Sequence, residues 1–136
     1  MSSPDTPAQT VLVPASIGEL IDKITILEIK STRIADAAKL ANVRHELALL
    51  NEIKNRHWSS DDALHRLSAE LRAVNEGLWN IEDEIRACEK QSAFGSKFVA
   101  LARSVYMEND KRSALKREIN LLFNSAIVEE KLYTHY

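Results

Sequence analysis

The sequence predicts an all-α protein: a four-helix antiparallel bundle made of helical hairpins, with a long third helix of the coiled-coil type. Eight apolar residues follow one another in steps of three and four from Leu64 to Cys88, and no polar residue interrupts this seam. The chain also has only three glycines and three prolines, and two of the prolines lie in the first ten residues. A helix with one apolar stripe must bury it against another long helix, in a helical bundle, an antiparallel hairpin or a coiled-coil oligomer. The seam, together with the broad apolar face of the first helix, predicts a homodimer.

The chain divides into a tail and one domain. Residues 1–13 are rich in Ser, Pro and Thr and are predicted to be a disordered or extended N-terminal tail, and residues 14–136 a single helical-bundle domain. The first helix is expected from Ile17 to about Ile34, with Ser16 as N-cap and Glu19 reaching back to complete a capping box. Its apolar residues cover more than half of its circumference, which predicts a central position or one shared between subunits.

The other three helices follow from spacing and from turn residues. The second is expected over residues 38–56, where apolar residues again recur in steps of three and four. The third is predicted to begin behind Ser60, because Asp61 and Asp62 suit the positive end of a helix dipole. The fourth is predicted to begin at Lys97, after a helix-terminating Gly95, and to extend to about residue 126; residues 128–136 form a charged tail with aromatic residues at its end.

The fourth helix loses its apolar stripe over residues 108–113. Continuing the stripe from Phe98 places Glu108 and Arg112 at positions where core residues are expected. Three interpretations remain open: a break between two helices, a helix that projects past its partner into water, or a buried polar site whose groups are paired.

A candidate ligand-binding site follows if the third and fourth helices pair antiparallel across the turn at residues 92–96. The same level of the hairpin then holds polar and aromatic side chains from both helices. These candidate residues are Trp79, Asp83, Arg103, Tyr106, Asn109 and Asp110. The alternative interpretation is a network of surface ion pairs, each of which contributes little to stability.

Other kinds of site find little support in the sequence. The four histidines include no pair at i, i+4, so we expect no metal site, and we expect no cofactor and no catalytic residues because nucleotide-binding glycine loops and nucleophile motifs are missing. Cys88 ends the seam, where cysteine behaves as a small apolar residue. A net charge of -2 predicts no binding to nucleic acid or to a membrane, and the N-terminus has no secretory signal, which favours the cytoplasm.

Two resemblances extend this interpretation. Ile17–Lys30, Leu78–Arg86 and Ala102–Asp110 resemble a small bacterial family of helical proteins that carries no established activity, which implies fold and a bacterial origin but no mechanism. Leu20–Arg33 is similar to the opening helix of the all-helical chorismate mutases, which are intertwined dimers. In that comparison Arg33 and Lys39 would match an arginine and a lysine of the anion-binding set, while Glu19 and Leu20 stand where the family has an arginine. Shared architecture is the main implication.

Function itself is not determined by the sequence. The preferred hypothesis is a non-enzymatic helical interaction or scaffold protein, because strong packing signals occur without a catalytic constellation. The alternative is a protein that binds a small ligand, or an enzyme, using the polar patch between the third and fourth helices. A homodimer and a further protein partner are the expected associations.

Overall fold

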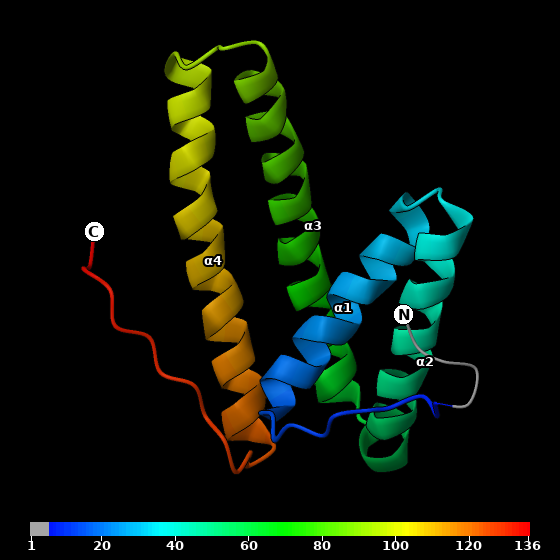
Figure 1. The fold of residues 1–136 in the computed structure, drawn as a ribbon. Coiled ribbons are helices and arrows are strands. Elements are labelled where there is room, and N and C mark those ends of the chain that lie inside the picture. Colours follow the sequence, from blue (N-terminus) through cyan, green and yellow to red (C-terminus); the bar gives the residue numbers. More distant parts are fainter. Residues whose placement is uncertain (1–5) are drawn as a thin grey trace.

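The computed structural model describes residues 6–136, and within them it contains four α-helices and no strand (Figure 1). The helices are α1 (Ile17–Arg33), α2 (Ala37–Trp58), α3 (Asp62–Lys90) and α4 (Ser96–Leu122). The all-α prediction is therefore confirmed. Residues 1–5 of the predicted tail lie outside the described part, and residues 6–13 belong to no helix, with Val11, Leu12 and Val13 exposed.

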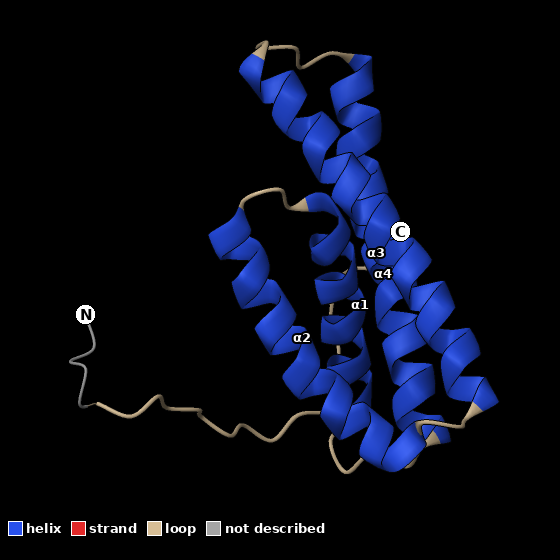
Figure 2. Ribbon diagram, turned by 90° about the vertical axis from the view of Figure 1, so that its right-hand side faces the viewer, coloured by secondary structure: helices blue, strands red, loops and turns tan. Residues whose placement is uncertain are grey.

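α1 is the central helix of the structure. It packs against each of the other three helices, whereas α2 packs mainly on α1 and lies at the margin of the fold (Figure 2). The main core cluster forms where α1, α3 and the end of α4 meet. Its buried members are Ile21, Ile24, Leu64, Leu67, Leu71 and Ile119. The broad apolar surface of α1 thus predicts its central position correctly.

The helix starts differ in detail from the sequence predictions. Ser16 caps α1 as predicted, since its Oγ accepts a hydrogen bond from the Glu19 N–H at 3.0 Å. The Glu19 carboxylate, however, forms an ion pair with Lys116 at 2.6 Å. The predicted start behind Ser60 is one residue early, because Asp61 is the N-cap of α3 and accepts from the Leu64 N–H. A carboxylate at this position satisfies a free backbone N–H and suits the positive end of the helix dipole.

The two ends of α4 also correct the predictions. Gly95 has an ordinary φ of -80° and is the N-cap of α4 without any side-chain bond, whereas Ser92 takes the left-handed conformation with a φ of 53°. At the other end α4 stops at Leu122, four residues before the predicted end. Asn124 has a φ of 53° there, and the Ser125 N–H bonds back to the Asn120 carbonyl.

The polar run of residues 108–113 is not a break between helices, because α4 is continuous through it. Arg112 lies against α1 and forms an ion pair with Asp22, so the buried polar site is the interpretation that holds for this residue. Glu108 pairs with Lys111 one turn away, at the surface.

The far part of the α3–α4 hairpin stands clear of α1 and α2 (Figure 1). We call residues 81–107 the projecting hairpin. The seam of α3 is fully buried at Leu64, Leu67 and Leu71 and is buried again at Cys88. Its members between these points are half-buried: Val74, Leu78, Ile81 and Ile85. Within the described residues no helix is both long and apolar enough to span a bilayer.

Candidate functional site

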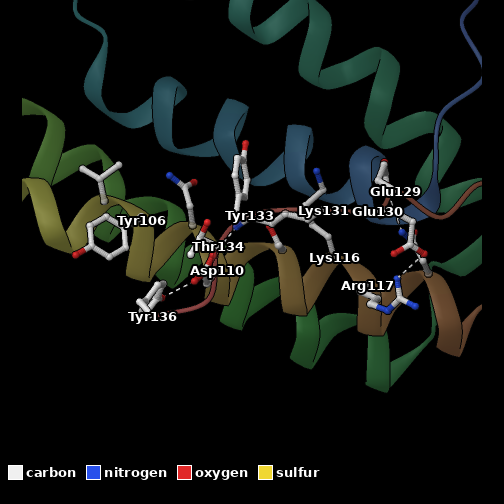
Figure 3. Close-up of a pocket in the computed structure, with 14 residues that line it drawn as sticks. Tyr106, Asp110, Lys116, Arg117, Glu129, Glu130, Lys131, Tyr133, Thr134 and Tyr136 are labelled. Carbon is white, nitrogen blue, oxygen red and sulfur yellow. Dashed lines mark hydrogen bonds and ion pairs between the residues drawn. The ribbon is translucent and has the colours of Figure 1, made fainter.

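The C-terminal segment forms the most unusual part of the surface. After α4 the chain reverses and returns along that helix without secondary structure (Figure 1). We call residues 127–136 the strap. Between the strap and α4 lies a cavity of about 680 Å³, lined by side chains of both (Figure 3). This volume falls in the range of ligand-binding clefts.

One end of the strap is anchored at the N-terminus of α1. Glu129 accepts hydrogen bonds from Ser16 Oγ at 2.5 Å and from Asn120 Nδ2 at 3.1 Å. Asn120 is itself held, because its Oδ1 accepts from the Gly18 N–H at 2.6 Å. Burial alone would raise the pKa of Glu129, but these hydrogen bonds and the nearby Lys116 hold it below the ordinary value of 4.5. The carboxylate therefore binds as an anion at a positive helix end.

The other end of the strap is anchored on Asp110. Lys131 Nζ lies 2.5 Å from one carboxylate oxygen, and the Tyr136 hydroxyl donates to the other. Tyr136 also packs edge-on against Tyr106, with the ring centroids 5.1 Å apart. The hydrogen bond from Lys131, and next that from Tyr136, lower the pKa of Asp110, while the same contact raises the pKa of Tyr136. Between the two anchors Arg117 pairs with Glu130 at 3.0 Å.

A second polar cluster lies in the interior between α1, α3 and α4. Asp22 is fully buried and accepts a bidentate pair of hydrogen bonds from the Arg112 guanidinium, with Nε 2.9 Å from Oδ1. The Asn75 side-chain amide bridges Asp22 and Thr25 at 2.9 Å each. The hydrogen bond to Asp22 raises the pKa of Arg112, which keeps the guanidinium charged. Every buried side-chain N or O atom of the described residues has a hydrogen-bond partner. This cluster therefore links the three helices and leaves no buried polar atom free for a ligand.

The structure separates the six predicted site residues into two groups. Tyr106, Asn109 and Asp110 line the cavity under the strap. Asp83 and Arg103 are exposed and do not line it.

Trp79 also lies outside the cavity. Its ring is 5.8 Å from the Arg33 guanidinium carbon, and Arg33 further bonds Asn80 at 2.8 Å. Ligand binding by the six residues as a set therefore stays a prediction. Arg33 and Lys39, the two residues matched to the mutase pattern, do not line the cavity either.

The strap is the part of the site that sequence reasoning missed. The tail of residues 128–136 is recognisable as charged and aromatic, but its partners Ser16, Asp110 and Arg117 lie far away in the sequence. The spacing of apolar residues along a helix does not reveal contacts between a segment without secondary structure and other parts of the chain. The one available signal is the run of two carboxylates and a lysine at Glu129–Lys131.

The described residues contain no group of three side chains suited to bind a metal ion. Cys88 is buried on the inner face of the hairpin. The surface of α4 under the strap has the features of a binding site. It has one position that accepts a carboxylate, one that accepts a cation, and exposed aromatic rings beside them.

Comparison with known proteins gives one match. The model of a family of unknown function, DUF6165, matches residues 11–136 and so includes all four helices and the strap. No curated protein and no solved structure matches the chain.

Proposed function

The chain belongs to this family of unknown function, and we propose that it is a non-enzymatic interaction protein that dimerises through its projecting hairpin. The observation that carries the proposal is the incomplete burial of the hairpin seam. Among the described helices, the far ends of α3 and α4 pack on each other and not on α1 or α2, although an apolar stripe of this length is typical of a helix that packs in a bundle.

Exposed apolar side chains accompany the half-buried seam. Phe94, in the turn before α4, is 52% exposed, and on α4 Val99 is 53% exposed and Met107 is also exposed. A second hairpin laid against the first would complete a four-helix bundle and remove these side chains from water. Two-fold pairing is the commonest way in which a chain completes such a surface.

The charges of the projecting hairpin favour pairing with a copy of itself. On α3, residues 81–90 carry four carboxylates and two basic side chains, whereas on α4, residues 96–107 carry two basic side chains and no carboxylate. A two-fold arrangement that places α3 of one copy beside α4 of the other brings opposite net charges together. Pairing α3 with α3 would oppose like charges, so the charge pattern also specifies the orientation.

Sedimentation equilibrium of the purified full chain tests the proposal. We expect twice the chain mass of 15.3 kDa. Val99→Glu places a carboxylate in the interface and should weaken dimerisation at least about tenfold, equivalent to about 1.4 kcal/mol. Leu49→Glu is the matched control, because Leu49 is 43% exposed on α2, outside the projecting hairpin. A monomeric wild-type protein, or an equal effect of both substitutions, would refute the proposal.

A further inference from the structure

In the strap, charged side chains point toward the protein and large apolar side chains point toward the solvent, which is the reverse of the usual arrangement. Its charged residues face α4, whereas Leu132 is 97% exposed and Tyr133 is 75% exposed. Within the described chain, residues 127–136 make no hydrogen bond from backbone to backbone. The strap is thus held by side-chain contacts alone, and exposed ion pairs contribute little each.

The surface beneath the strap presents an ordered series of binding positions. We call it the strap groove. Ser16 and Asn120 receive a carboxylate at the N-terminus of α1, Arg117 receives the next carboxylate along, and Asp110 receives a cation. The order of charges in an extended occupant is therefore fixed as acid, acid, base.

We propose that the strap groove is a docking site for an extended segment of a partner protein that carries two consecutive carboxylates followed by a lysine, and that the strap is its intramolecular competitor. Charge complementarity identifies the chemistry of the segment, since Glu129, Glu130 and Lys131 show which charges the groove accepts. The inference does not rest on dimerisation of the hairpin.

A segment can occupy the strap groove only if it binds tightly enough to displace the strap. A tethered segment has an effective concentration of the order of millimolar, so the identical strap of a second copy gains nothing by replacing it. A partner segment displaces the strap only if it makes additional contacts. The cavity of about 680 Å³ that the strap leaves open beside Tyr106 provides them for an apolar or aromatic side chain.

The test uses the full chain with the groove intact and the strap weakened. A variant with Glu129→Gln, Glu130→Gln and Lys131→Ala removes the charges of the strap. A fluorescent peptide with the wild-type sequence of residues 127–136 then reports by anisotropy on the groove of this variant, in which the competing strap is weakened. We expect the variant to bind this peptide at least about tenfold more tightly than the wild-type chain does, because the tethered competitor is lost.

Two controls make the result decisive. Adding Asp110→Asn and Arg117→Gln to the variant should abolish binding; both side chains lie at the surface, and circular dichroism checks that the fold is intact. A peptide of scrambled sequence should not bind. Equal binding to the wild-type chain and the strap variant, or equal binding of the scrambled peptide, would overturn the proposal. Loss of self-association caused by the strap substitutions would identify a second copy as the occupant and would overturn it as well.

Discussion

Replacing Gly18 by alanine should destabilise the protein, although alanine is the better helix former. Gly18 lies where α1 crosses α4. A Cβ atom added there would be 2.5 Å from the Lys116 carbonyl oxygen and 2.9 Å from Asn120 Oδ1. Because that carbonyl belongs to the α4 backbone, it cannot rotate away, and the two helices must separate by about 1 Å to restore ordinary contact.

The magnitude follows from three contributions. Overpacking costs about 1–3 kcal/mol. Separation of the helices also breaks the buried bond from the Gly18 N–H to Asn120, which now measures 2.6 Å, and this costs about 1–3 kcal/mol. The higher helix propensity of alanine offsets at most about 1 kcal/mol. We therefore expect the free energy of unfolding to fall by about 1–5 kcal/mol.

Gly77 provides the matched control. It lies within α3, and a Cβ atom there would meet no atom within 4 Å. Gly77→Ala should therefore raise the free energy of unfolding by about 0.5–1 kcal/mol. Urea unfolding followed by circular dichroism measures both values. A Gly18→Ala protein as stable as the wild type would refute the inferred close approach of α1 and α4.

Two further predictions concern the buried ion pair and the strap. Arg112→Ala leaves the fully buried Asp22 carboxylate without its partner and should lower the free energy of unfolding, measured in urea, by about 3–5 kcal/mol. Asp22→Asn leaves a partly exposed guanidinium that water can solvate and should lower it by less. A larger loss for Asp22→Asn would contradict the buried ion pair between these two residues. Strap docking should also depend on pH. Docking lowers the pKa values of Asp110 and Glu129, so the contributions of these carboxylates to docking are fully present above the ordinary value of 4.5 and are lost as the pH falls through the lowered carboxyl values. Docking raises the pKa of Tyr136, so its contribution is present below the ordinary value of 10.0 and is lost as the pH rises through the raised value. Amide NMR shifts of residues 127–136 measure this, and shifts independent of pH would contradict it.

The helices were predictable because local patterns encode them. The seam beginning at Leu64 determines both the type and the extent of α3, and the apolar surface of α1 determines its central place. The predicted helix bounds lie within a few residues of the observed ones. The errors occur at caps and at the end of α4, where Asp61, Ser92 and Asn124 compete with neighbours of similar preference.

The site was less predictable because its contacts join distant segments. Arg112 breaks the apolar pattern of α4, and the sequence shows this, but its partner Asp22 lies 90 positions away. The sequence predicts Tyr106 and Asp110 as candidate site residues, yet the partner of both is Tyr136 of the strap and not α3. Spacing along one helix identifies which face is polar, and it does not identify what covers that face.

Hydrogen–deuterium exchange of the full chain, measured above and below the concentration at which it dimerises, tests the proposed function most directly. It reports which amides become protected by association. We predict that protection rises with protein concentration in the projecting hairpin, residues 81–107, and stays constant in α2. Exchange that is independent of concentration in the hairpin, or protection confined to α2, would contradict the proposal.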